Sequence, residues 1–186
     1  MPPTPATPLE VYCIFCGIID QAAVQRIFQT LVTATNPANN VKHIHLLFQS
    51  SGGNVGDGVC LYNFFKSLPV DLTLYNAGSV SSIAVIAYLG AEKRKTSTRA
   101  TFVIHRSHVS PQFATATRLQ SFAESLTVED QRTESILREH IKLPDEKWSD
   151  FTNQELFFSG EEAVKIGLAD EVGEFSPPKG TQIFNI

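Results

Sequence analysis

Residues 78–91 read GSVSSIAVIAYLGA, in which two adjacent serines, Ser81 and Ser82, follow a glycine and precede a long apolar run. The apolar residues are almost continuous, which predicts a helix that is buried on most of its sides. A serine at the start of such a helix commonly caps free backbone N–H groups. The same N–H groups and the helix dipole also favour a developing negative charge, so a serine here is equally suited to be a nucleophile.

Short apolar segments alternate with amphipathic segments on both sides of this helix. We expect strands at residues 10–18, 43–49, 71–78, 101–105 and 168–175, and further helices at residues 22–34, 55–68, 115–140 and 161–167. Alternation of strands and helices is typical of an α/β domain with a largely parallel sheet.

The composition limits the classes of protein to be considered. The chain has 186 residues, of which 42% are hydrophobic and 18% charged, as expected for one globular domain. A formal net charge of -4 argues against a general affinity for nucleic acid or for anionic lipid. The sequence has neither an apolar run of membrane-spanning length nor the features of a signal peptide. We therefore expect a cytoplasmic protein without nucleic-acid or membrane partners.

Three cysteines are present, Cys13, Cys16 and Cys60. An odd number without a secretion signal indicates free thiols. Cys13 and Cys16 form a Cys-x-x-Cys pair inside an expected strand, where side chains alternate between the two faces. We therefore interpret them as buried structural cysteines, in preference to a redox or zinc pair.

Polar or glycine-rich residues follow three of the expected strands. Residues 50–53 (SSGG) follow the second strand, the serine pair follows the third, and His105 closes the fourth. Sites in open α/β sheets form at the carboxyl ends of the strands. His105 is thus a candidate base for Ser82, with His108 a weaker one because it lies further into the loop. The glycines could present N–H groups to a ligand.

Four stretches together resemble the proteolytic subunit of the Clp protease, a family with the Clp protease/crotonase-like fold. They are HLLFQSSGGNVGDGVCLYNFFKSL (45–68), GSVSSIAVIAYLGA (78–91), TFVIHRSH (101–108) and LFFSGEEAVKIGLADEV (156–172). Their order and spacing are similar over residues 11–172. The resemblance implies an α/β fold of repeated ββα units with a largely parallel sheet and a projecting handle helix.

The resemblance also implies an activity and its residues. Ser82 would be the nucleophile of a serine endopeptidase and Ser81 the ordinary residue at the helix start. His105 would be the base and Asp170, in IGLAD, the acid of a Ser-His-Asp triad. The N–H groups of Gly53 and Ile83 would form the oxyanion hole. No cofactor and no metal are implied.

The same resemblance implies the organisation of the chain and its partners. Residues 1–10 would be a short N-terminal extension, 11–175 a single domain with its handle at about 111–150, and 176–186 a C-terminal tail. The chain would assemble into rings, heptameric and stacked in pairs, and cleave peptides or unfolded proteins. An ATPase unfoldase is a possible partner, although the short N-terminal region argues against dependence on one.

Several residues depart from the family pattern. Ser51 replaces a proline, Ala84 replaces a glycine, and Arg106-Ser107-His108 replaces a sequence that begins with Gln-Pro. Residues 152–156, TNQEL, stand where the family has an Asp-Arg pair. These departures indicate a divergent member that could act alone. Two alternatives stay open, a crotonase-like acyl-CoA enzyme and a catalytically silent ring subunit.

Overall fold

The computed structural model describes residues 9–186 and contains two sheets. The larger sheet has six strands in the order β8-β5-β3-β2-β1-β9, and all neighbours are parallel. Its strands are β1 (Leu9–Cys16), β2 (Val41–Gln49), β3 (Asp71–Asn76), β5 (Lys93–Thr96), β8 (Glu171–Val172) and β9 (Ile183–Asn185). This arrangement confirms the α/β fold with a largely parallel sheet.

A smaller sheet lies beside the carboxyl ends of the large one. It has three strands, β4 (Ser79–Ser81), β6 (Thr101–Ile104) and β7 (Leu156–Ser159), in the order β4-β6-β7. β4 and β6 are parallel, whereas β6 and β7 are antiparallel. A single bridge between Ser50 and Val80 links the end of β2 to this sheet.

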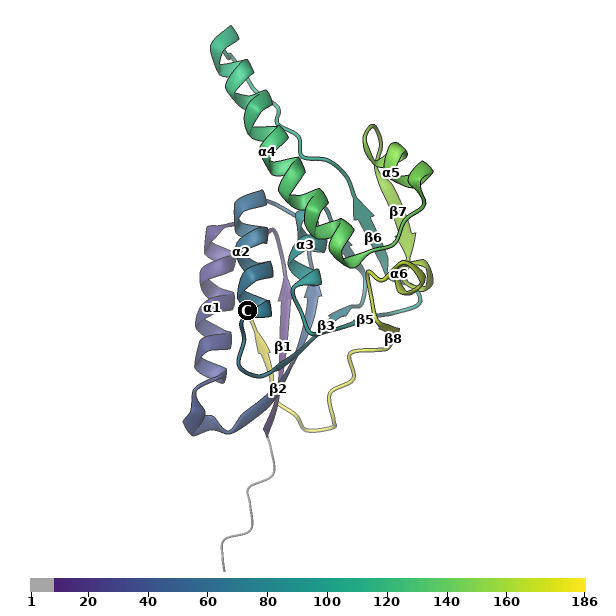
Figure 1. Ribbon diagram of the computed structural model, residues 1–186. Helices are drawn as coiled ribbons and strands as arrows, with labels where there is room; N and C mark the ends of the chain where they lie inside the picture. The colour runs from purple at the N-terminus through teal and green to yellow at the C-terminus, as the bar shows by residue number, and fades with distance from the viewer. Residues whose placement is uncertain (1–8) are drawn as a thin grey trace, which may run out of the picture.

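Within residues 9–186, six α-helices connect the strands. They are α1 (Gln21–Ala34), α2 (Val55–Lys66), α3 (Ile83–Leu89), α4 (Ala116–His140), α5 (Asp145–Phe151) and α6 (Gly160–Ile166). Figure 1 shows α1 and α2 side by side on one face of the large sheet, while α4 projects beyond the rest of the molecule. None of the helices within residues 9–186 has both the length and the apolar character needed to cross a membrane.

The main core lies between the large sheet and its helices. Alternate side chains of β2, Ile44, Leu46 and Phe48, are fully buried and share a cluster with residues of α1 and α2 such as Ile27 and Phe65. All seven residues of α3 are buried, as its nearly continuous apolar sequence predicts. The opposite face of β2 carries His43 and His45, which are only partly buried.

The expected boundaries hold for the long elements and are wrong for the short ones. The sequence did not predict five short elements, namely β4, β5, β7, α5 and β9. The strand predicted at residues 168–175 is only the two-residue β8, Glu171–Val172. β5, Lys-Arg-Lys-Thr, has no apolar residue, so hydrophobic alternation could not reveal it. Leu9 and Glu10 belong to β1, and the supposed tail supplies β9 as a sheet edge. The rest of the expected extension, residues 1–8, lies outside the described residues.

Candidate active site

Ser82 lies at the junction between β4 and α3 in a strained conformation. Its φ of 59° and ψ of -134° fall in a region that side-chain-bearing residues rarely occupy. Its N–H donates to the Val103 carbonyl (2.7 Å) and its carbonyl accepts from the Val85 N–H (3.0 Å), which holds the turn. The Ser82 side chain caps no N–H group of the helix. A sharp strand-to-helix turn of this kind exposes a serine hydroxyl, as the nucleophile elbow of other hydrolases does.

The glycine loop after β2 packs directly against this serine. Gly52 has a φ of +104°, and a Cβ there would lie 2.6 Å from the Ser82 Cβ. A Cβ on Gly53 would lie 2.1 Å from the Ile19 carbonyl oxygen. Both positions therefore require glycine, and the backbone of the loop approaches Ser82 as closely as packing allows. Close contact with Ser82 accounts for Gly52, and close contact with the Ile19 backbone accounts for Gly53.

His105 follows β6 and is oriented by its own backbone. Its Nδ1 lies 2.7 Å from the carbonyl oxygen of Arg106. A carbonyl oxygen can only accept, so Nδ1 carries the proton of the neutral ring and Nε2 keeps its lone pair. The imidazole is thus held in the tautomer that a general base needs.

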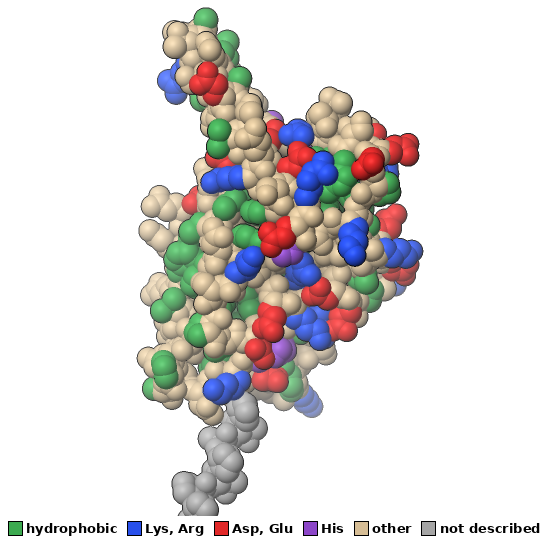
Figure 2. Space-filling view, in the orientation of Figure 1, with side chains coloured by type: hydrophobic (Ala, Val, Ile, Leu, Met, Phe, Trp, Pro, Cys, Tyr) green, Lys and Arg blue, Asp and Glu red, His purple; other side chains and the backbone are tan. Residues whose placement is uncertain are grey.

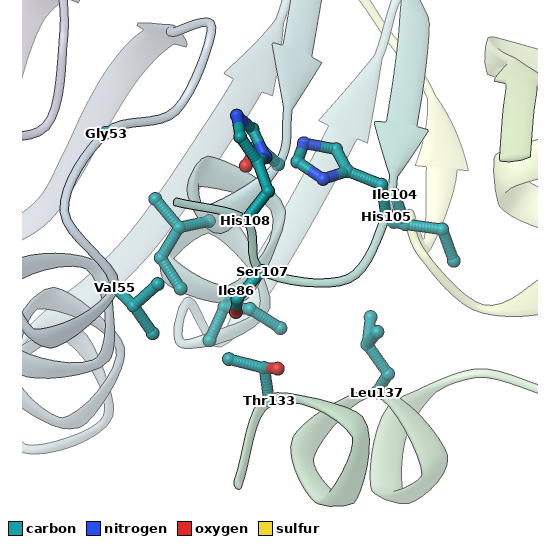
Figure 3. Close-up of a pocket in the computed structure, with 11 residues that line it drawn as sticks. Gly53, Val55, Ile86, Ile104, His105, Ser107, His108, Thr133 and Leu137 are labelled. Atoms are coloured by element: carbon teal, nitrogen blue, oxygen red, sulfur yellow. The ribbon is translucent and has the colours of Figure 1, made fainter. Parts of the chain in front are cut away.

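Ser82 and His105 line one pocket of about 150 Å³. Figure 3 shows the rings of His105 and His108 directed toward one another, with Thr133 and Leu137 entering from α4. The two ring centroids are 5.4 Å apart. The remaining wall is mostly apolar and includes Gly53, Val55, Ile83, Ile86, Ile104, Ser107 and His108. The expected nucleophile, base and both oxyanion residues are therefore brought to one place.

Comparison with known proteins agrees with this arrangement. The family model described as Clp protease matches residues 9–176. The chain belongs to the Clp protease family. Among solved structures, it is similar to that of a ClpP1 mutant from Listeria monocytogenes, with a TM-score of 0.75. The sequences are 22% identical, and the match covers 89% of this chain and 91% of the other, which shows that the fold is shared.

The expected acid of this Clp protease family member, Asp170, is not bonded to His105. Its Oδ2 accepts from the backbone N–H of Arg94 (2.8 Å), and its Oδ1 pairs with the Arg94 guanidinium. The Asp170 N–H in turn donates to the Arg94 carbonyl (2.8 Å). These bonds fix Asp170 against β5, and it is absent from the pocket lining. The expected Ser-His-Asp triad therefore needs correction: Asp170 is bonded to Arg94, and Nδ1 of His105 is bonded to the Arg106 carbonyl.

A further carboxylate lies near the end of the pairing between β6 and β7. The last pair of these antiparallel strands is Ile104 with Leu156, and His105 and Glu155 are the next residues beyond it. Glu155 is exposed and lies in TNQEL, one of the departures from the family pattern. Its place near the end of β6 follows from the pairing of two strands about 50 residues apart, which the local sequence does not reveal.

The loop after His105 is fastened to α4 by charged groups. The Arg106 guanidinium pairs with Glu134 (2.7 Å) and Asp130 (3.4 Å), and Asp130 also accepts from the Ser107 N–H (2.7 Å). The same guanidinium lies over the Phe151 ring, 5.4 Å from its centroid. These contacts hold the Arg106 carbonyl that orients His105. Arg106 and Ser107, two of the residues that depart from the family pattern, thus attach the loop after His105 to α4.

Two smaller expectations need correction. Ser81 does not begin the helix. It ends β4, its N–H donates to the Ser50 carbonyl, and its hydroxyl lies 3.0 Å from that of Ser79. Cys13 and Cys16 lie on opposite faces of β1 as expected, but only Cys13 is buried. Burial raises the pKa of the Cys13 thiol to about 11.

Proposed function

We propose that this Clp protease family member is a serine peptidase whose catalytic residues are Ser82 and His105. The Arg106 carbonyl orients the His105 imidazole, as the carboxylate does in a Ser-His-Asp triad. The observation that carries the proposal is the 2.7 Å contact between Nδ1 of His105 and that carbonyl, in the pocket that also contains the strained Ser82. A fixed tautomer is the main requirement for the base, because the wrong tautomer costs about 10⁴-fold in rate.

The reaction then follows the chemistry of acyl transfer. Ser82 Oγ attacks the peptide carbonyl carbon while its proton passes to Nε2 of His105. The oxyanion is stabilised by the N–H groups of Gly53 and Ile83, which donate to no acceptor within residues 9–186. His105 returns the proton to the leaving amine as the C–N bond breaks. Water then attacks the acyl-enzyme by the same route and releases Ser82.

The pocket supports a preference for peptides with an apolar side chain before the cleaved bond. Its volume of about 150 Å³ suits one side chain, and Ile86, Ile104 and Leu137 contribute apolar walls. No acidic or basic side chain of residues 9–186 lines it apart from the two histidines. We expect a peptide with leucine at this position to be cleaved at least tenfold faster than one with aspartate, because burying an unpaired carboxylate is costly.

Family membership implies assembly into oligomeric rings and peptide substrates. We propose that the rings are heptameric and stack through α4, whose outer half carries exposed apolar residues such as Leu119 and Val128. We also propose that cleavage of short peptides needs no ATPase unfoldase. Mass photometry of the native chain, and of a Leu119→Glu Val128→Glu variant, tests the stacking. The assembly formed by the variant should have half the mass of the native assembly, as expected for single rings.

A fluorophosphonate probe tests the nucleophile. Ser82→Ala should lose labelling and peptide cleavage, whereas Ser81→Ala should keep both, since within residues 9–186 the Ser81 hydroxyl hydrogen-bonds to that of Ser79 and does not line the pocket. The two variants remove the same atom from adjacent residues, so Ser81→Ala is a matched control. Persistent labelling of Ser82→Ala would disprove the assignment.

One observation favours a second candidate, a catalytically silent ring subunit. The carboxylate predicted to complete the triad is bound to Arg94. A silent subunit would show neither labelling nor cleavage in the assembled state, while still forming rings. Labelling of Ser82 in the native assembly decides against it.

A further inference from the structure

We propose that Glu10, His43 and His45 form a binding site for one divalent transition metal ion, of which Zn²⁺ is the best match. The site is distinct from the peptidase pocket. It occupies the face of the large sheet opposite α1 and α2, on the first halves of β1 and β2. In the view of Figure 2, histidine side chains lie beside acidic ones on the visible surface of the molecule. Ligand atoms of the three side chains all lie within 4.8 Å of one another. Two imidazoles and a carboxylate are ligands that Zn²⁺ and its neighbours in the first transition row prefer.

The distance between two of these groups fits a shared metal better than a direct bond. Nε2 of His45 and Oε2 of Glu10 are 3.5 Å apart, which is too long for a good hydrogen bond. Zinc bonds of about 2.0–2.1 Å in a tetrahedron place neighbouring ligand atoms about 3.3 Å apart. The 3.5 Å between Nε2 of His45 and Oε2 of Glu10 is therefore close to the distance between two ligand atoms of one zinc ion.

A buried nitrogen without a partner supplies independent evidence. Nε2 of His45 is inaccessible to solvent and has no hydrogen-bond partner within residues 9–186. The His45 side chain as a whole is only 12% exposed. Buried polar atoms are almost always satisfied, so an orphan atom aimed at a carboxylate indicates a missing ligand.

Neighbouring hydroxyl groups lie within hydrogen-bond distance of all three side chains. The Tyr75 hydroxyl lies 2.8 Å from Nδ1 of His45, the ring nitrogen that faces away from Glu10. The Thr73 hydroxyl lies 2.7 Å from Nε2 of His43, and the Tyr12 hydroxyl donates to Oε2 of Glu10 (2.9 Å). Metal ligands in proteins are characteristically held by such a second layer of hydrogen bonds, which fixes the ring orientation.

The rings at the site stack closely, and their neighbours are charged. The planes of the His43 and His45 rings are 23° apart with centroids 4.0 Å apart, so one ring must rotate before both can direct a lone pair at one ion. Tyr12 also stacks on His45, at 4.5 Å. The nearby Lys95 is paired with Glu171 (2.9 Å), so its charge is offset. Glu10 is 53% exposed and leaves the fourth position open to water.

Co²⁺ is the probe for this site, because it replaces Zn²⁺ and its absorption spectrum reports coordination geometry. The native chain, without an affinity tag, is titrated with Co²⁺ and then with Zn²⁺ as a competitor. We expect one Co²⁺ per chain, with the intense visible bands of tetrahedral coordination, displaced by one equivalent of Zn²⁺. A thiolate charge-transfer band would instead show that cysteines bind the metal, and would overturn the proposal.

Mild variants identify the ligands without endangering the fold. Glu10→Gln keeps the shape of an exposed side chain and should weaken Co²⁺ binding at least tenfold. Tyr75→Phe removes only the hydroxyl that faces His45. It should weaken Co²⁺ binding about tenfold, because hydrogen bonds to metal ligands typically contribute this much to affinity. Glu92→Gln changes an exposed carboxylate away from the three ligands and should bind as the native protein does.

His45→Gln provides the strongest test, combined with circular dichroism to confirm folding. A folded His45→Gln variant that still binds one Co²⁺ with native affinity would overturn the proposal, as would a native chain that binds none. Fluorophosphonate labelling of Ser82 should be retained in Glu10→Gln. The metal site and the peptidase proposal can therefore fail independently.

Discussion

Asp170 and Arg94 are joined by two kinds of bond, since the carboxylate binds both the backbone N–H and the guanidinium of the arginine. The Asp170 N–H completes a reciprocal link by donating to the Arg94 carbonyl. Asp170 thus joins the turn after α6 to β5. Its position in the fold is that of a structural carboxylate, and this assignment can be distinguished from a catalytic one by experiment.

Replacement of Asp170 by asparagine should affect stability far more than catalysis. The Arg94 side chain is 13% exposed and that of Asp170 is 37% exposed, so the pair is only partly screened by solvent. We expect the free energy of unfolding in urea to fall by about 1–2 kcal/mol, between the values for exposed and buried pairs. The kcat for a peptide should change less than about threefold. A drop approaching 10⁴-fold in the folded variant would restore Asp170 as the acid.

Gly52→Ala should disturb Ser82 directly. The added Cβ would meet the Ser82 Cβ at 2.6 Å, and alanine is strained at a φ of +104°. We expect a loss of about 2–3 kcal/mol in the free energy of unfolding and at least tenfold slower labelling by fluorophosphonate.

Gly180→Ala is the matched control for this change. Gly180 has a similar φ of +87° but no atom within 4 Å of the added Cβ. It should cost about 1 kcal/mol and leave labelling unchanged. Equal labelling of the two variants would mean that the close approach of the glycine loop to Ser82 does not matter.

Arg106→Lys should reduce kcat about tenfold with little change in KM. Lysine keeps the positive charge but cannot span Asp130 and Glu134, so the carbonyl that orients His105 becomes less restrained. Arg138→Lys is the control, because Arg138 shares Glu134 but packs over Trp148. The kcat and KM for a peptide, measured for the folded Arg106→Lys and Arg138→Lys variants, test this prediction. A purely structural role of Arg106 would lower stability without this split between kcat and KM.

His140 should make the protein less stable as the pH falls. Burial, followed by the nearby charge of Arg94, lowers the pKa of His140, whose Nε2 lies 3.0 Å from the Tyr62 hydroxyl. Because the folded pKa lies below the unfolded value of about 6.5, the unfolded state binds more protons in the window below that value. The contribution of His140 is thus fully present above the unfolded pKa and is lost as the pH falls through the folded one.

Urea unfolding at pH 7, 6 and 5 measures this contribution. The charged groups facing His140 are Arg94, Lys66, Glu139 and Asp170, and they remain in His140→Gln. The variant should therefore show a smaller loss of stability than the native chain over this range. Identical pH profiles would show that His140 titrates with the same pKa in both states.

The three thiols should differ in reactivity. Cys16 and Cys60 are exposed, whereas Cys13 is buried with its pKa raised to about 11. Because the thiolate is the reactive form, two thiols per chain should react with iodoacetamide at pH 8 and the third only after unfolding in urea. Rapid reaction of Cys13 in the folded protein would contradict the burial.

Long periodic segments were predictable from the sequence, and short ones were not. The helices at residues 22–34 and 115–140 could be predicted because many residues follow one periodic pattern. β4 has only three residues, and its main-chain partners are β6 and Ser50. No local pattern marks such a strand, because its stability depends on pairing with residues distant in the chain.

The sequence by itself determined the family, the α/β fold, and the placement of Ser82, His105 and the glycine loop at neighbouring strand ends. Those features follow from the order of strands and helices, because parallel strands bring their carboxyl ends to one edge. Only the tertiary structure decided which groups surround each side chain. It placed Asp170 on Arg94, turned Nδ1 of His105 to the Arg106 carbonyl, and brought Glu10 to two histidines of the adjacent strand. Such contacts depend on register and on side-chain direction to within a few ångström, which a linear sequence does not contain.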